Sequence, residues 1–288
     1  MTRTASSIAA FLLAFENLYF MLSGLAMLDV FYVTFMMAGF LLFVAQKYVS
    51  SGVAIGLSTL SKLSGFFGGL TVVLDWIYSY QQRRHKRFVW TVIAAVVVFI
   101  ALMVLLNFAI VQKWSSFLNP IARIIDMLGL AGGLTFSYST HPYKSPPWEW
   151  LYQYKTMPFY ISPHYTAAIS FSIWFLIIPA FAYLIYRAKK RDEAGIFGLC
   201  WLIATYLIWI PIVLVTRRVT YIYYFYPAVG AVCLGIGIAL SQLIDIFKHR
   251  QNGWSRWLAL SIVIVVIAAH IVSFIVLAPL LPVNILKL

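Results

Sequence analysis

The chain has few charged residues, few acids and only two cysteines, and each scarcity excludes a class of protein. Charged residues make up 10% of its 288 positions, whereas soluble domains carry about 25%, so a water-soluble domain is excluded. Cys200 and Cys233 both lie in apolar runs. That placement excludes a disulfide framework and predicts two small buried side chains. His141 has no second histidine or cysteine near it, so we expect no metal site and no cofactor.

Hydrophobic residues fill 63% of the chain, mostly in long runs that predict membrane-spanning helices. A helix needs about 20 apolar residues to cross a hydrocarbon layer of ~30 Å. We therefore expect an all-α, polytopic membrane protein with about eight to nine transmembrane helices. The expected helices cover 5–22, 28–46, 53–61, 63–80, 88–111, 166–186, 194–215, 221–247 and 257–281. The first is expected to be a retained span rather than a cleaved signal, because Glu16 and Asn17 interrupt it.

Three consecutive segments follow from this pattern. Residues 1–112 hold the N-terminal transmembrane helices, including a short hairpin within 50–80 whose tip is near Lys62. Residues 113–165 form a long loop on the outer face. Residues 166–288 form a C-terminal region of four transmembrane helices.

The net charge of +13 is explained by topology rather than by a nucleic-acid partner. Most basic residues fall in short loops that share one side if the N-terminus is cytoplasmic: Arg3, Lys47, Arg83, Arg84, Lys86, Arg87, Arg187, Lys189, Lys190, Arg191, Lys248, Arg250 and Arg256. The remaining ones include Lys113, Lys144 and Lys287. This bias predicts a cytoplasmic N-terminus and an outer or luminal C-terminus. It places Asp29, Lys62, the long loop, Arg217 and Arg218 together on the outer side.

Within the long loop, residues 119–130 have apolar side chains at helical spacing and predict an amphipathic helix on the membrane surface, ended by Gly129, Gly132 and Gly133. The stretch 140–150 is rich in proline and aromatic residues, which indicates an ordered loop. Trp148 and Trp150 suit stacking on a sugar ring. An interfacial aromatic belt explains them equally well.

Several ionisable residues have both a structural and a functional interpretation. Asp29 is either a site acid or a favourable charge at a helix N-terminus. Lys62 either extends to the interface or binds a phosphate. The hydroxyls that would assist it are those of Ser58, Thr59, Ser61 and Ser64. Glu16 is either functional or hydrogen-bonded to Asn17 or to a neighbouring helix.

Arg217 and Arg218 are positive charges on the disfavoured side, and arginine pairs well with phosphate oxygens. The tyrosines that follow are typical of an aromatic belt: Tyr221, Tyr223, Tyr224 and Tyr226. Asp75 and Asp245 lie nearer the expected cytoplasmic face, where they would balance the basic loops.

Four stretches, in order, resemble motifs of the dolichyl-phosphate-mannose–protein O-mannosyltransferases. Residues 23–29 are similar to the family's Arg-x-Ala-x-Leu-Asp segment, and 56–65 to its Gly-Leu-x-x-x-x-Lys-Trp-x-Gly hairpin. Residues 141–150 resemble its His-x-Tyr-x-Ser-x-Pro-Trp-x-Trp loop. Residues 218–227 follow its Arg-x-x-Phe-x-Tyr-Tyr-x-x-Pro segment, with Tyr221 in place of Phe.

The resemblance implies a membrane glycosyltransferase of the C-type fold. Such an enzyme moves mannose from a polyprenyl (dolichyl) phosphate donor to Ser or Thr hydroxyls of an acceptor protein on the outer or luminal face. Lys62 and Arg218, with Arg217, would bind the donor phosphate. His141, Tyr143, Trp148 and Trp150 would form a loop beside the donor. Asp29, Tyr221 and Tyr223 would support the site.

The chain departs from the family at two places. Gly24 stands where the family has arginine. The family's catalytic Asp-Glu pair belongs to an outer loop upstream of the first matching motif. We therefore expect the C-terminal two-thirds of such an enzyme, and we name no catalytic residue. Three alternatives stay open: a fragment, one half of a split enzyme whose catalytic loop is on a separate subunit, or a non-catalytic relative. The alternative is a polyprenyl-phosphate-sugar binding or transport protein without transferase activity.

Overall fold

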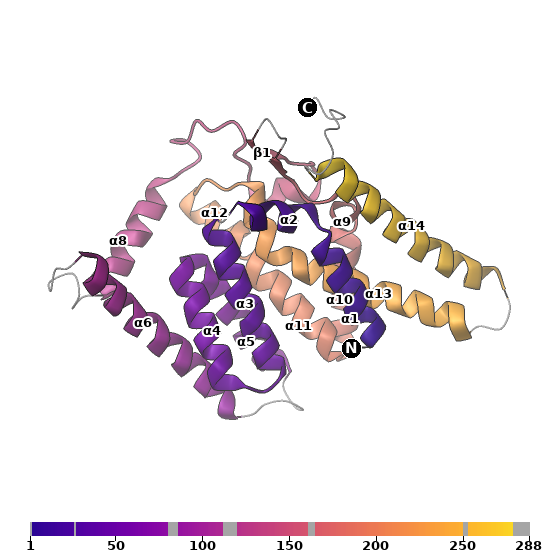
Figure 1. The fold of residues 1–288 in the computed structure, drawn as a ribbon, viewed down its shortest axis with the longest axis horizontal. Helices are drawn as coiled ribbons and strands as arrows, with labels where there is room; N and C mark the ends of the chain where they lie inside the picture. Colours follow the sequence, from indigo (N-terminus) through magenta and orange to yellow (C-terminus); the bar gives the residue numbers. More distant parts are fainter. Residues whose placement is uncertain are drawn as a thin grey trace. The chain divides into compact units, whose positions relative to one another are not determined.

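A computed structural model describes residues 2–25, 27–79, 86–111, 120–160, 165–249 and 253–278, and these are mainly helical (Figure 1). The all-α fold class is confirmed for this part of the chain. Several residues named above lie outside the described ranges: Arg83, Arg84, Lys113, Asn119, Arg250, Lys287 and the expected outer C-terminus.

The chain forms two compact units, each assembled from separate parts of the sequence. Unit 1 comprises Met1–Leu25, Ser145–Leu202 and Tyr221–Leu288, and unit 2 comprises Ala26–Lys144 and Ile203–Thr220. The expected segments 1–112, 113–165 and 166–288 divide the chain by its expected membrane topology, whereas the two units divide it by internal contacts. The units therefore do not test these segments, which stay predictions.

Unit 2 is built around a hairpin of short helices. Its elements are α3 (Leu28–Val44), α4 (Tyr48–Ser61), the 3-10 helix η1 (Leu63–Gly65), α5 (Phe66–Tyr78), η2 (Lys86–Phe88), α6 (Val89–Val111), α8 (Pro120–Gly133), the π-helical turn η4 (Ile203–Leu207) and α12 (Trp209–Thr216). The α4–η1–α5 hairpin matches the prediction, with Lys62 between α4 and η1. Helix α8 lies where the amphipathic helix was expected. It ends at Gly133, the last of the three glycines expected to end it, and so extends three residues beyond the predicted boundary at residue 130.

Small residues let α4 pack closely against α6. A Cβ atom on Gly52 would lie 2.3 Å from the carbonyl oxygen of Thr91, and one on Gly56 would lie 2.8 Å from that of Ala95. The two glycines are four residues apart and therefore share one face of the helix. This is the small-xxx-small packing that membrane helices use, because close backbone approach replaces the hydrophobic driving force available in water.

Unit 1 surrounds one long helix, α13. Its elements are α1 (Arg3–Ala14), α2 (Asn17–Gly24), η3 (Pro147–Leu151), β1 (Met157–Tyr160), β2 (Tyr165–Ala167), α9 (Phe171–Trp174), α10 (Ile177–Lys189), α11 (Glu193–Leu202), η5 (Ile222–Phe225), α13 (Tyr226–His249) and α14 (Trp254–Leu277). Most of α13 up to Ser241 is buried. A Cβ on Gly237 would lie 2.8 Å from the carbonyl oxygen of Ala5, and one on Gly230 would lie 2.3 Å from the Trp201 ring.

Within the described residues, four helical stretches are long and apolar enough to cross a membrane: Val89–Ala109, Glu193–Thr216, Ile222–His249 and Trp254–Leu277. A fifth is added if Arg3–Ala14 and Asn17–Gly24, which meet at a bend of 54°, count as one span. These helices support a membrane protein. The expected count of eight to nine spans is not confirmed.

The difference arises where hydropathy does not detect a break in the backbone. Residues 166–186 are mostly apolar, yet they hold the end of β2, an extended stretch, the one-turn helix α9 and most of α10. Strand β2 pairs with β1 in an antiparallel ribbon that the all-α prediction did not include, with Met157 opposite Ala167. Helix α3 has 17 residues, which is shorter than the length of a full span.

Candidate functional site

The best-defined ion pair in unit 2 joins two of the predicted site residues. The ammonium nitrogen of Lys62 lies 2.7 Å from Oδ1 of Asp29. Asp29 stands in the first turn of α3 and is 3% exposed, whereas the Lys62 side chain is 27% exposed. The same ammonium group is 5.6 Å from the centre of the Tyr32 ring. Asp29 therefore lies at a helix N-terminus, as one of its two interpretations expected, and its role as a site acid stays a prediction.

The tip of the hairpin holds Lys62 in place through close backbone contact. The Ser58 hydroxyl donates to the carbonyl oxygen of Tyr32 on α3 at 2.7 Å. A Cβ on Gly65 would lie 2.3 Å from the carbonyl group of Ser58, so only glycine fits where the chain turns from α4 into α5. Lys62 is thus positioned by two helices and a glycine rather than left at the end of a mobile loop.

The hydroxyl groups around Lys62 do not form the expected phosphate cradle. Besides Ser58, Thr59 donates to the Ile55 carbonyl at 3.0 Å and Ser61 to the Leu57 carbonyl at 2.9 Å. These bonds to the preceding turn are common for hydroxyls in apolar helices. Ser64 is the exception, because its Oγ is enclosed and has no hydrogen-bond partner within the described residues.

Arg217 and Arg218 are fixed against the beginning of the long loop. The Phe136 N–H donates to the Arg217 carbonyl at 2.9 Å, and the Val219 N–H donates to the Leu134 carbonyl at 2.8 Å. These two bonds make an isolated antiparallel bridge, with Thr135 opposite Arg218. Arg217 ends α12 in the left-handed region, with φ at 54°. Its side chain is exposed, and that of Arg218 is half-buried.

Lys144 closes the loop on itself. Its ammonium group donates to the carbonyl oxygens of Phe136 at 2.7 Å and Ser139 at 2.6 Å. The exposed His141 and Tyr143 lie within this closed turn, where the Tyr143 N–H donates to Nδ1 of His141 at 3.3 Å. No sequence signal distinguishes Lys144 as the organiser of the loop, because two backbone carbonyls leave no pattern in the sequence.

Unit 2 holds both the Asp29–Lys62 pair and the two arginines. Helix α5 packs against η4, and the rings of Phe67 and Trp209 are 5.4 Å apart, edge to face. Phe67 is near the start of α5, and α12 continues for two turns beyond Trp209 before Arg217. Asp29, Lys62, Arg217, Arg218 and the His141 turn (residues 141–144) all belong to unit 2, whereas the long loop from Ser145 onward belongs to unit 1. The grouping of the long loop with these residues on the outer side stays a prediction. We call the group of Asp29, Lys62, Arg217, Arg218 and the His141 turn the cationic end.

The other predicted loop residues belong to unit 1, and Trp150 does not have the expected role. It is fully buried, donates from Nε1 to the Ser145 hydroxyl at 2.9 Å, and meets the Phe225 ring edge-on. Trp174 donates in turn to the Trp150 carbonyl at 2.8 Å. Trp150 is a core residue, so its prediction as a sugar-stacking surface was wrong. Trp148 remains half-buried.

The tyrosines at the start of η5 form a row of rings in unit 1. Tyr221 and Tyr223 are stacked, with centroids 5.6 Å apart and planes 7° apart. Phe159 of β1 continues the row at 6.3 Å from Tyr223. The two tyrosines are half-buried, which fits either interpretation of them, as an aromatic belt or as support for a site.

Glu16 is a structural acceptor at the break between α1 and α2. Its Oε2 accepts the Tyr19 N–H at 2.9 Å, and its Oε1 accepts the Ser170 N–H at 2.8 Å. Asn17 extends this junction, because its Nδ2 donates to the carbonyls of Thr166 and Ala168. The structural interpretation of Glu16 is favoured, although its main partner is the backbone before α9 rather than Asn17 itself.

Most carboxylate groups near the predicted site already have an ion-pair or hydrogen-bond partner. Asp29 pairs with Lys62, Glu149 pairs with Lys155 at 2.7 Å, and Glu16 caps α2. Asp126 is exposed on α8. Among the described residues, no group of three or more His, Cys, Asp or Glu side chains is placed to hold a metal ion. Cys200 and Cys233 are buried free thiols, as predicted.

No protein-family model matches the chain, and neither a curated protein nor a solved structure matches it significantly. The resemblance to the O-mannosyltransferases therefore rests on the four short motifs alone.

Proposed function

We propose that the cationic end of unit 2 binds the phosphate of a polyprenyl-phosphate-linked sugar. On this proposal the protein is a glycosyltransferase that moves a sugar, mannose by resemblance, to Ser or Thr hydroxyls of an acceptor protein, or it is the C-terminal part of such an enzyme. The observation that carries the proposal is the bridge that fixes Arg217 and Arg218 against residues 134–136, in the unit that also holds Lys62.

The charges indicate which of these residues would bind the phosphate and which would lie beside it. The Lys62 charge is paired with Asp29, and Arg217 and Arg218 bring two further positive charges to the same unit. A guanidinium group presents several N–H donors in a fixed plane that matches phosphate oxygens. In sugar transfer the phosphate is the leaving group, and cations beside it stabilise the charge that develops on it. We assign Arg217 and Arg218 to the phosphate, and Lys62 to a place beside it that is fixed by Asp29.

The proposal includes an orientation. The N-terminus is cytoplasmic, and the cationic end faces the outer or luminal side, because the basic loops concentrate on the opposite side. Eight to nine crossings would require α3, α4, α5 and α10 to act as short or re-entrant spans. At 1.5 Å per residue, the 17 residues of α3 extend about 25 Å, close to the ~30 Å hydrocarbon core.

A second function, donor binding without transfer, is favoured by the state of the acids. Asp29, the acid beside the proposed phosphate site, is already paired with Lys62, and Glu149 is paired with Lys155. A general base must reach the acceptor hydroxyl with a free oxygen. On this alternative the chain holds or presents the lipid-linked sugar for a catalytic loop on another subunit.

The two functions are separated by measuring binding and transfer on the same preparation. The full-length chain is purified in detergent and given radiolabelled polyprenyl-phosphate mannose with a Ser/Thr-rich peptide. Mannosylated peptide supports the transferase. Donor binding without product supports the binding protein, and no donor binding contradicts both.

The residue assignment is tested by substitution. Arg218→Ala and Lys62→Ala should each weaken donor binding, about tenfold or more for the arginine, because a charge-assisted hydrogen bond is worth about 1.5–3 kcal/mol. The matched control is Arg123→Ala, which removes an arginine exposed on α8 of the same unit. Unchanged binding in both site variants would remove the phosphate assignment.

A further inference from the structure

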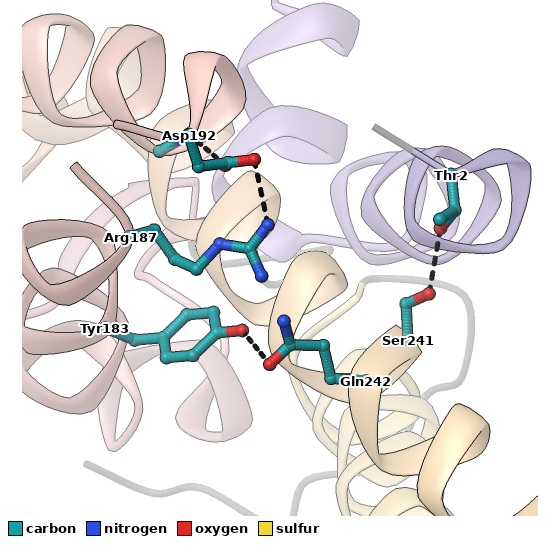
Figure 2. Close-up of polar contacts among 7 residues, drawn as sticks. Thr2, Tyr183, Arg187, Asp192, Ser241 and Gln242 are labelled. Carbon is teal, nitrogen blue, oxygen red and sulfur yellow. Dashed lines mark hydrogen bonds and ion pairs between the residues drawn. The ribbon is translucent and has the colours of Figure 1, made fainter. Parts of the chain in front are cut away.

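One end of unit 1 carries a polar network that joins four helices (Figure 2). Thr2, just before α1, shares a hydrogen bond of 2.9 Å with Ser241 of α13. Tyr183 of α10 donates to the side-chain oxygen of Gln242 at 2.5 Å. The start of α1, the end of α10, the start of α11 and the last turns of α13 therefore meet at one end of this unit.

Arg187 of α10 and Asp192, which precedes α11, form an ion pair that we call the clamp, as Figure 2 shows. Nη2 of Arg187 lies 2.9 Å from Oδ1 of Asp192, and Oδ2 of Asp192 accepts the Gly195 N–H at 2.8 Å. Burial alone would raise the pKa of Asp192, but the hydrogen bonds from Arg187 and from the Gly195 N–H outweigh burial and hold its pKa below the usual value. Asp192 is therefore ionised, and its negative charge is paired with the Arg187 guanidinium group.

The clamp fixes the turn that presents three further cations. Arg191 has φ at 58°, and its N–H donates to the Ala188 carbonyl at 2.9 Å. The Asp192 N–H donates to the Arg187 carbonyl at 3.1 Å. The turn therefore begins at Arg187 and ends at Asp192, the same two residues that form the clamp. The side chains of Lys189, Lys190 and Arg191 are all exposed on this turn.

Neighbouring helices add positive charge at the same end. Arg3 in the first turn of α1 and Lys248 in the last turn of α13 are both exposed. The acids at this end besides Asp192 are Glu193, which is half-buried, and Asp245, which is exposed. We call the exposed cations the basic end of unit 1: Arg3, Lys189, Lys190, Arg191 and Lys248. They outnumber the two acids that remain.

The basic end lies where lipid headgroups are expected. The candidate span Glu193–Thr216 begins directly after the cationic turn, and the span Ile222–His249 ends one residue after Lys248. Cations at the end of a membrane span lie at headgroup depth, where each attracts anionic lipids. Because the Arg187–Asp192 clamp holds the turn, these cations reach the headgroups without first being ordered.

We propose that the basic end of unit 1 binds the phosphate groups of anionic phospholipids in the adjoining leaflet. The proposal is independent of the sugar-donor site, since that site is assigned to residues of unit 2. It goes beyond membrane topology, because it predicts a preference for anionic over zwitterionic lipid that depends on one turn.

The test uses the full-length chain in phosphatidylcholine bilayers that contain trace spin-labelled phosphatidylglycerol. Electron spin resonance measures the association of this lipid relative to spin-labelled phosphatidylcholine. We expect the wild-type chain to prefer phosphatidylglycerol, and the triple variant K189Q/K190Q/R191Q to lose at least about threefold of that preference. Each charge removed can lower the preference by up to roughly fivefold, which corresponds to the attraction of one Lys or Arg to an anionic membrane surface. Raising the salt concentration should remove the preference in the wild-type chain.

The matched control is a pair of double variants. K189Q/K190Q removes two charges of the basic end, whereas K47Q/R87Q removes two exposed charges of unit 2. A larger loss in the first supports the proposal. Equal losses would show a diffuse charge effect and overturn it, as would an unchanged preference in the triple variant. Asp192→Asn tests the clamp separately. It keeps all five cations but breaks the pair with Arg187, so we expect a lower preference because the turn is no longer held. Thermal unfolding of each variant confirms that it is folded.

Discussion

Two carboxylates at helix N-termini, Glu16 in unit 1 and Asp29 in unit 2, are almost equally buried but are engaged differently. Both oxygens of Glu16 accept backbone N–H groups, from Tyr19 and Ser170. Asp29 is engaged by the ammonium group of Lys62, which is itself partly exposed. A carboxylate whose two oxygens both accept backbone N–H groups holds two chain segments together. One that is paired with an exposed cation leaves that cation beside solvent, where a ligand can reach it.

The comparison predicts the largest loss of stability when Glu16 is removed. Glu16→Ala leaves the N–H groups of Tyr19 and Ser170 buried without an acceptor, at about 1–3 kcal/mol each. We expect the free energy of unfolding in detergent to fall by about 3 kcal/mol. The measurement is a denaturant or thermal unfolding curve of the full chain.

Glu149→Ala is the control for Glu16, because it removes a carboxylate from a partly exposed pair with Lys155. Such pairs contribute about 0–1 kcal/mol, so this variant should be nearly as stable as the wild type. Equal losses in the two variants would contradict the structural role of Glu16.

The second prediction concerns the hairpin that positions Lys62. In Gly65→Ala the new methyl group would lie 2.3 Å from the Ser58 carbonyl, so the tip must shift. Overpacking of this kind costs about 1–3 kcal/mol, and we expect donor binding to weaken along with stability. Gly129→Ala on α8 is the control, since nothing lies within 4 Å of its Cβ. A Gly65 variant with wild-type binding would show that the tip does not position the site.

The third prediction is an asymmetry within the Asp29–Lys62 pair. Lys62→Gln leaves a buried carboxylate without its partner, whereas Asp29→Asn leaves an ammonium group that can extend into water. We expect a loss of about 2 kcal/mol for the first variant and about half of that for the second. The double variant should be more stable than Lys62→Gln alone, which a double-mutant cycle of unfolding measures directly. Equal single losses would mean that Asp29 is not the buried member.

The smallest effect sharpens the comparison with a third carboxylate, Asp192. Its pKa is lowered in the folded chain, so its contribution is complete above the unfolded pKa of about 3.9 and is lost as the pH falls through the folded value. Asp192→Asn keeps an N-cap residue but loses the pair with Arg187. We expect it to be less stable by at most about 1 kcal/mol at pH 7. The difference should begin to shrink below about pH 4 and close once the pH is below the folded pKa. A difference that does not shrink as the pH falls below about 4 would contradict the charge-based role.

The sequence predicted those parts of the fold and site that depend on local pattern. The hairpin tip at Lys62, the helix with Asp29 in its first turn and the amphipathic helix after residue 119 follow from glycines, charges and periodicity. Charge counting placed Lys62, Arg218 and the long loop on one side of the membrane; Lys62, Arg218 and His141 belong to unit 2, and their common side stays a prediction. Trp150 could not be assigned in this way, because an aromatic residue in a loop is buried or exposed according to its distant neighbours, here Ser145 and Phe225.

The breaks in the helices also escaped the sequence. Hydropathy averages over about 20 residues, so a short extended stretch inside an apolar run leaves no trace. The stretch before α9 is stabilised by Glu16 and Asn17, some 150 residues earlier in the chain. Such a pairing is set by the tertiary fold, and both polar residues are equally compatible with an unbroken span.

The most direct test of the account is whether the cationic end of unit 2 binds phosphate. The dissociation constants of polyprenyl phosphate and of the matching polyprenol, which lacks only the phosphate, are measured for the full-length wild-type chain, Arg218→Gln and Arg123→Gln. We predict that wild type and Arg123→Gln bind the phosphate form at least about tenfold more tightly, the effect of 1.4 kcal/mol, and that this preference is lost in Arg218→Gln. An equal preference in all three proteins would contradict the assignment of the phosphate to Arg218.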